Sequence, residues 1–158
     1  RVIIVGIRKD LDDTFTFPKP YQSAPPTVGE VLKDLMGSNG WKSLDLWVKM
    51  ADKIAPTLVG GSKKHGGPDL GPTRARKAWL ELGVDGRGIA NAAPTNNDPL
   101  PPRLTPRMLA RIQGFPDDWN FGEKKTKACR MIGNAFPPPV AMNVGLQIIN
   151  VLRQNSTK

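Results

Sequence analysis

Apolar residues open the chain as a continuous run and recur later at helical spacing. Residues 1–8, Arg-Val-Ile-Ile-Val-Gly-Ile-Arg, form a β-branched run typical of a strand that is buried on both faces. This run predicts a sheet of the α/β class. Because it starts at the first residue without a preceding turn, we expect it to continue an element that lies before Arg1.

Two helices are expected next. Thr27 and Glu30 have capping-box spacing, and the helix that they begin is expected to end near Gly37. Its apolar positions repeat at helical intervals: Val28, Val31, Leu32, Leu35 and Met36. Pro56 ends a second helical face, which consists of Trp41, Leu44, Trp47, Val48, Ala51 and Ile54. Thr57–Val59 is predicted to be a brief strand.

A basic helix is predicted after residue 72. Thr73 can cap it and Gly83 can end it. Its inward face is apolar and consists of Ala75, Ala78, Trp79 and Leu82. Arg74, Arg76 and Lys77 lie mainly on its other faces, where they can contact phosphates or belong to an ordinary solvated surface.

Two further helices are expected near the end of the chain. Thr105 is a suitable N-cap with Pro106 in the first turn, and Arg107 and Arg111 share one face of that helix. These two cations need an anion between them, which can be a phosphate or the carboxylates of 117–118. The last helix is expected to pack on the sheet through Val140, Val144, Ile148, Val151 and Leu152.

Charge increases along the chain. The net charges of residues 1–37, 38–102 and 103–158 are 0, +3 and +6. This distribution favours a polyanionic partner, because neutralised phosphates release counterions, although a solvated basic surface or an acidic protein partner would give the same charge. Four glycines in residues 60–67 leave Lys63, Lys64 and His65 exposed in a loop that can approach such a ligand.

Composition excludes several classes of protein. No apolar run approaches the ~20 residues of a membrane span, so we expect no membrane association. A single cysteine excludes an internal disulfide, and no secretory signal is present, which makes the cytoplasm the expected compartment, in association with the nucleoid. No Cys and His spacing supports a zinc site, so no bound metal is expected.

Two blocks near the end of the chain carry a family resemblance. Residues 103–118 read Arg-Leu-Thr-Pro-Arg-Met-Leu-Ala-Arg-Ile-Gln-Gly-Phe-Pro-Asp-Asp, and residues 130–141 read Arg-Met-Ile-Gly-Asn-Ala-Phe-Pro-Pro-Pro-Val-Ala. They resemble the last two blocks of the DNA cytosine-5 methyltransferases, of the bacterial restriction-modification type. Residues 1–8 resemble the block that follows Gln-x-Arg-x-Arg in that family, and the three blocks stand in its unpermuted order.

The resemblance implies an α/β fold that is incomplete in this chain. It would supply a late strand and the C-terminal helix of a Rossmann-like methyltransferase sheet, together with a small loop-rich target-recognition domain. The expected boundaries are 1–37 for the C-terminal portion of the catalytic domain, 38–118 for the target-recognition region with its following block, and 119–158 for the return to the catalytic domain.

The resemblance also implies a reaction. In such enzymes a Cys thiolate attacks C6 of a flipped cytosine, and C5 takes a methyl group from S-adenosylmethionine. The family's Pro-Cys nucleophile and Gly-rich cofactor loop are absent from this sequence, so we expect the chain to be inactive alone. Its expected partners are double-stranded DNA and the N-terminal catalytic half. A natural split-enzyme subunit and a non-catalytic, sequence-specific DNA-binding module remain alternatives.

Site residues follow from the matched blocks. Arg1 matches a family contact to the flipped base or its phosphate, while Asn134 and Ala135 match positions beside the cofactor. Asn134 could instead be a left-handed turn residue that ends a loop. The candidates for phosphate or base contacts in the variable region are Lys63, Lys64, His65, Arg74, Arg76 and Arg87. Cys129 follows Ala128 and not a Pro, so we expect a buried structural thiol, although Lys127 and Arg130 could lower its pKa.

Overall fold

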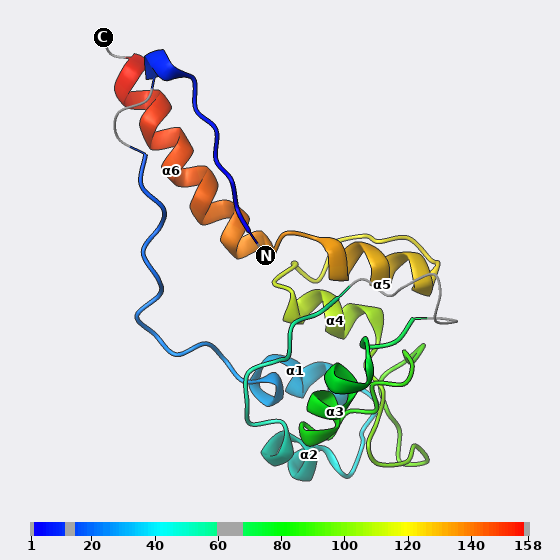
Figure 1. Cartoon of the computed structure of the whole chain (residues 1–158). Helices are drawn as coiled ribbons and strands as arrows, with labels where there is room; N and C mark the ends of the chain where they lie inside the picture. Colours follow the sequence, from blue (N-terminus) through cyan, green and yellow to red (C-terminus); the bar gives the residue numbers. More distant parts are fainter. Residues whose placement is uncertain (1, 12–14, 60–67, 157–158) are drawn as a thin grey trace. The chain divides into compact units, whose positions relative to one another are not determined.

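The computed structural model describes residues 2–11, 15–59 and 68–156, and in these residues it contains helices but no strand. A short 3-10 turn, η1 (Lys9–Leu11), precedes six α-helices (Figure 1). The helices are α1 (Val28–Gly37), α2 (Leu44–Met50), α3 (Thr73–Glu81), α4 (Pro106–Ile112), α5 (Lys125–Asn134) and α6 (Pro138–Ser156). The chain divides into a terminal unit, residues 1–23 with 136–158, and a helical unit, residues 24–135.

Helix α1 begins at the predicted capping box. The Thr27 hydroxyl accepts a hydrogen bond from the Glu30 backbone N–H at 3.3 Å, and the Glu30 carboxylate accepts one from the Thr27 N–H at 2.7 Å. The helix turns Val28, Leu32 and Met36 into the core, as the apolar spacing predicts. Local capping and tertiary burial therefore agree over this segment.

Helix α2 is shorter than the apolar pattern suggests. It ends at Met50, and Ile54 is 63% exposed. The chain leaves the helix here because the carbonyl oxygens of Ala51 and Lys53 accept hydrogen bonds from the N–H groups of Gly29 and Val28, which have no partner within the first turn of α1. The prediction of a strand at 57–59 is also wrong, because the described residues provide no neighbouring strand for it.

The start of α3 corrects another prediction. Pro72, without a side-chain cap, occupies the N-cap position, and Thr73 is the first helical residue. The Thr73 hydroxyl instead accepts a 3.3 Å hydrogen bond from Arg76 Nη2. The end is as predicted, because Gly83 adopts a left-handed conformation (φ +67°) directly after the Leu82 C-cap.

Helices α4 and α5 complete the core of the helical unit. The Thr105 hydroxyl accepts a hydrogen bond from the Met108 N–H at 3.3 Å, and Pro106 lies in the first turn of α4, so the predicted helix start is confirmed. The core contains three tryptophans and the inward residues of α4 and α5. Its members at these two helices are Met108, Leu109, Ala110, Cys129 and Ile132.

The terminal unit pairs an extended segment with a long helix. Residues 2–8 lack the expected strand assignment, and Val2 and Ile4 are each 89% exposed. The segment runs beside α6, against which η1 packs (Figure 1). Helix α6 buries Val144 and Val151 but not against a sheet, contrary to the prediction. A strand needs a hydrogen-bonding neighbour, and the described residues of this unit offer none.

No single helix among the described residues is both long and apolar enough to cross a membrane. Helices α5 and α6 reach the length and apolar composition of a membrane span only when the two are counted together, with the bend between them.

Candidate functional site

The structure describes some of the predicted site residues and not others. Arg1, Lys63, Lys64 and His65 lie outside the described residues. Arg74 and Arg76 lie on α3, where Arg74 is exposed and Arg76 is half-buried. Arg87 lies in the loop that follows α3 and is exposed. The described candidates for DNA contact therefore all belong to α3 and the loop after it.

Asp85 is the buried centre of a charged cluster in that loop. Its Oδ1 accepts hydrogen bonds from the Arg87 backbone N–H at 3.0 Å and from Arg87 Nε at 2.8 Å. Its Oδ2 accepts from Arg87 Nη2 at 3.2 Å and from Arg103 Nε at 3.0 Å. These hydrogen bonds, led by those of the Arg87 side chain, hold the pKa of Asp85 well below its ordinary value.

The Asp85 cluster borders a pocket of about 500 Å³. Lys125 also lines this pocket, and its ammonium donates to the Ile89 carbonyl oxygen at 2.7 Å and to Asn91 Oδ1 at 2.8 Å. The Asp98 carboxylate in the lining is engaged by the N–H and hydroxyl of Thr95. Three cations thus face two engaged carboxylates, an arrangement that suits an anionic or hydrogen-bond-accepting ligand.

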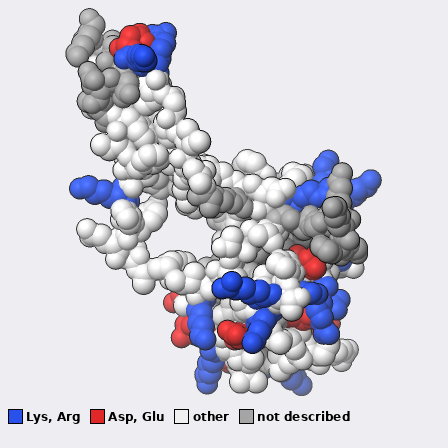
Figure 2. Space-filling model, in the orientation of Figure 1, with Lys and Arg blue, Asp and Glu red and all other residues white. Residues whose placement is uncertain are grey.

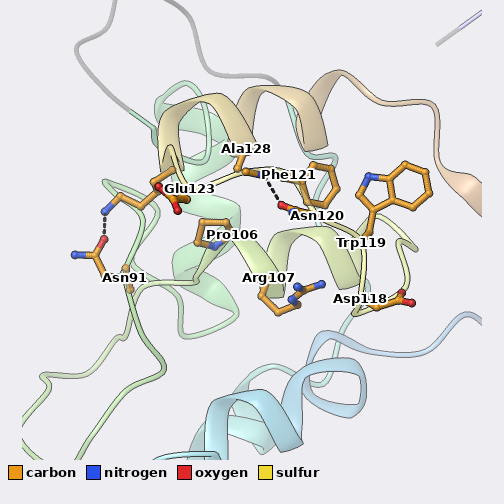
Figure 3. A pocket seen from close by; sticks show the side chains of 12 residues that line it. Asn91, Pro106, Arg107, Asp118, Trp119, Asn120, Phe121, Glu123 and Ala128 are labelled. Carbon is orange, nitrogen blue, oxygen red and sulfur yellow. Dashed lines mark hydrogen bonds between the residues drawn. The ribbon is translucent and has the colours of Figure 1, made fainter.

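A second pocket, of about 580 Å³, shares part of its lining with the first, and Figure 3 shows this second pocket. Ala90, Asn91 and Lys125 line both. Figure 3 shows Trp119 and Phe121 at one end of the second pocket and Asn91 at the other. The cations of this pocket are balanced by the carboxylates of its lining, so its charge does not favour a polyanion.

Arg111 is bound by carboxylates of the protein, which was one of the two alternatives that the sequence left open for this cation. Its guanidinium donates to Asp117 through Nε at 3.0 Å and through Nη2, and to Asp34 through Nη1 at 2.5 Å. Nη1 also donates to the Val31 carbonyl oxygen at 3.3 Å. Carboxylates within the protein therefore engage this cation, and Arg111 is part of a structural ion-pair network that joins α4 to α1.

The two terminal motif blocks meet beside the predicted cofactor residues. Gln113 Nε2 donates a 2.9 Å hydrogen bond to the Ala135 carbonyl oxygen. Asn134 is the last residue of α5 and is exposed. No described residue other than glycine has a positive φ, so the left-handed-turn explanation for Asn134 does not apply. The Asn134 amide is presented at the surface by a helix end.

Cys129 is buried in α5, as expected of a structural thiol. Burial raises the pKa of this thiol to about 11, and the nearby Lys125 ammonium opposes that shift only in part. We therefore predict that thiol reagents react with Cys129 slowly in the native protein at mildly alkaline pH and rapidly after denaturation. Equal rates of reaction with Ellman's reagent in the two states would contradict this burial.

Surface charge differs between the two units. Figure 2 shows Lys and Arg side chains gathered over the helical unit, with fewer Asp and Glu among them. The visible surface of α6 between its ends carries no charged side chain, in keeping with a sequence that has no Asp, Glu, Lys or Arg from 131 to 152.

Among the described residues, no group of three or more His, Cys, Asp or Glu could hold a metal ion.

Sequence reasoning missed Asp85, Arg103 and Lys125 as members of a site. The Asp85-Gly86-Arg87-Gly88 segment carries a turn signal, but its pairing with Arg103 spans eighteen residues. Lys125 reaches Ile89 across thirty-six residues. No local sequence pattern predicts either contact.

Comparison with known proteins decides the family. The family model described as C-5 cytosine-specific DNA methylase matches residues 1–150. The chain belongs to this family. The match includes all three blocks on which the resemblance rests, and the family fits an α/β fold whose sheet is not present in the described residues.

The relatives are Type II methyltransferases by name. The chain is 53% identical to the Type II methyltransferase M.NaeI of Lentzea aerocolonigenes, over 94% of this chain and 36% of the relative. It is 45% identical to the Type II methyltransferase M.NgoMIV of Neisseria gonorrhoeae, over 99% and 50%. The chain therefore spans between about a third and a half of the length of these two relatives. No solved structure matches the chain.

Proposed function

We propose that this chain is the C-terminal portion of a DNA (cytosine-5-)-methyltransferase. It recognises a DNA sequence and helps to transfer a methyl group from S-adenosylmethionine to C5 of a flipped cytosine in the cytoplasm. The family match over residues 1–150 carries this proposal, and the basic helical unit supports its DNA-binding part. The nucleophilic Cys lies in the N-terminal catalytic half, so the chain alone is inactive.

Residues 1–37 and 119–158 are assigned to the catalytic domain and 38–118 to target recognition. Helix α6 supports a return to the catalytic domain, because it exposes several large apolar side chains and has no charge before Arg153. Apolar surface of this extent is normally covered by a partner. The exposed residues are Val140, Met142, Leu146, Ile149 and Leu152. We propose that the N-terminal catalytic half covers them, within one polypeptide or as a separate subunit.

Asn134 and Ala135 are proposed to contact S-adenosylmethionine. The Asn134 side chain is exposed, and the backbone beside it is fixed by the hydrogen bond from Gln113 to Ala135. An exposed amide on a fixed helix end suits a polar cofactor, whose transferable methyl group supplies the one-carbon unit. Arg1 is proposed to contact the flipped cytosine or its phosphate.

Asn134→Ala tests this assignment in the assembled enzyme. We expect about a 10-fold weaker binding of S-adenosylmethionine, the equivalent of one lost hydrogen bond to a polar ligand. Isothermal titration with S-adenosylmethionine gives the affinity, and methyl transfer gives the consequence. Asn143→Ala, on α6, is the matched control and should leave the affinity unchanged. Full affinity in Asn134→Ala would contradict a contact between this amide and the cofactor, whereas salt-sensitive DNA binding that neither S-adenosylmethionine nor Asn134→Ala changes would favour the alternative of a DNA-binding module that does not methylate.

A further inference from the structure

The Asp85 carboxylate fixes the plane of the Arg87 guanidinium. Arg87 donates to it through both Nε and Nη2, which makes a bidentate interaction along one edge of the guanidinium. The Asp85 side chain is only 10% exposed, whereas the Arg87 side chain is 74% exposed. A buried carboxylate therefore orients a side chain whose remaining edge faces solvent.

The Arg8–Asp10 pair has the same bidentate geometry as the Arg87–Asp85 pair but a different environment. Arg8 also donates to Asp10 through Nε and Nη2, but the Arg8 and Asp10 side chains are 73% and 60% exposed, and no third side chain among the described residues binds them. Asp85 differs because Arg103, from a distant segment, binds its second oxygen. The Asp85 cluster is anchored in the tertiary structure, and the Arg8 pair is local.

Gly88 contributes to this anchoring. A Cβ atom at Gly88 would lie 3.2 Å from Arg103 Nη1 and 3.3 Å from its Cζ. The absence of a side chain at Gly88 thus lets the Arg103 guanidinium lie against the backbone while it binds Asp85. Two cations on one carboxylate leave the cluster with a net positive charge, which favours an anionic partner such as DNA.

Three of the five Arg87 N–H donors have no partner among the described residues. They are the two hydrogens of Nη1 and the second hydrogen of Nη2, which lie along the outer edge of the guanidinium. Two parallel donors in a fixed plane match the O6 and N7 acceptors of guanine in the major groove. A phosphate can also accept two parallel hydrogen bonds from Arg, but every DNA sequence presents the same phosphates. A base contact additionally requires the donors to lie near the plane of the base edge, and the fixed plane of the Arg87 guanidinium meets that requirement.

We propose that Arg87 reads a guanine of the DNA target in the major groove and that Asp85 is its positioning residue. This inference rests on the proposed function of the chain as the recognition part of a DNA methyltransferase. It goes further by naming the base, the edge that is read and the carboxylate that aligns the reader.

The test uses the full-length enzyme and selects binding sites from a randomised DNA duplex. Wild type should select a site that contains a required guanine. Arg87→Lys keeps the charge but loses the planar fork, and we expect it to lose roughly 10-fold of the preference at that one guanine while the other positions keep theirs. Asp85→Asn should lower the same preference. Arg8→Lys breaks the exposed Arg8 pair and should leave every position unchanged.

A second measurement changes the DNA instead, and its result with wild type does not depend on how a variant folds. Replacing the selected guanine with 7-deazaguanine removes the N7 acceptor, and we expect weaker binding by wild type but no further loss in Arg87→Lys. A uniform loss across all sequences in Arg87→Lys would identify a phosphate contact and overturn the proposal, as would a wild type without sequence preference. Sequence-selective binding without methyl transfer would overturn the proposed function and leave the guanine assignment standing.

Discussion

Replacing Trp47 with alanine is expected to destabilise the helical unit by about 3–5 kcal/mol. Trp47 is fully buried in α2, and its indole Nε1 donates a 3.1 Å hydrogen bond to the Gly83 carbonyl oxygen. The substitution leaves a cavity and an unpaired carbonyl oxygen in a core shared by α1, α2 and the end of α3. Urea unfolding followed by far-ultraviolet circular dichroism measures the loss.

Trp119→Ala is the matched control for the same change of residue. Trp119 is 51% exposed and contacts Phe115 and Phe121 at the surface. Its loss should cost less than about 1.5 kcal/mol, the range of one aromatic pair. A loss of stability in Trp119→Ala equal to that in Trp47→Ala would contradict the position of the core.

Arg111→Ala is expected to cost about 2 kcal/mol of stability. The Arg111 guanidinium is 21% exposed and binds the carboxylates of Asp34 and Asp117, so its removal leaves both without their cation. Hydrogen bonds to charged groups contribute about 1.5–3 kcal/mol each, but these carboxylates are more than half exposed and solvent screens them. Arg74→Ala, on the exposed face of α3, is the control and should change stability by less than about 0.5 kcal/mol.

The Arg111 network also makes stability depend on pH. Hydrogen bonds from Arg111 lower the pKa of Asp34 and of Asp117 below the ordinary value of 3.8. The folded state thus favours the charged carboxylates, and this stabilisation is present above about pH 4 and is lost as the pH falls through the lower pKa values of the folded state. Urea unfolding from neutral to acidic pH should show a smaller acid loss in Arg111→Ala than in wild type. Identical acid profiles would contradict the network.

Local sequence signals predicted the helices of this chain well where capping and apolar spacing agree. Thr27 and Thr105 begin helices as expected, and Gly83 ends α3. The prediction failed where distant segments compete for backbone hydrogen bonds. Helix α2 stops early because the backbone carbonyls that follow it bind the start of α1, and no periodicity encodes that exchange.

The candidate site was predictable only in part. Arg87 stood out as a loop cation, but the role of Asp85 depends on Arg103, which lies eighteen residues away in the sequence. The expected strand at 2–8 was not found because a strand is stabilised by neighbours, and the described residues supply none. Its apolar sequence agrees with the α/β fold that the family fits.

Methyl transfer by separated parts of the enzyme tests the central proposal most directly. Labelled S-adenosylmethionine and double-stranded DNA would be supplied to this chain alone, to the N-terminal catalytic half alone and to their mixture. We predict transfer to DNA only in the mixture, because Cys129 is buried with a raised pKa and we propose that the catalytic nucleophile lies in the N-terminal half. Transfer by this chain alone would contradict the proposal and direct attention to Cys129.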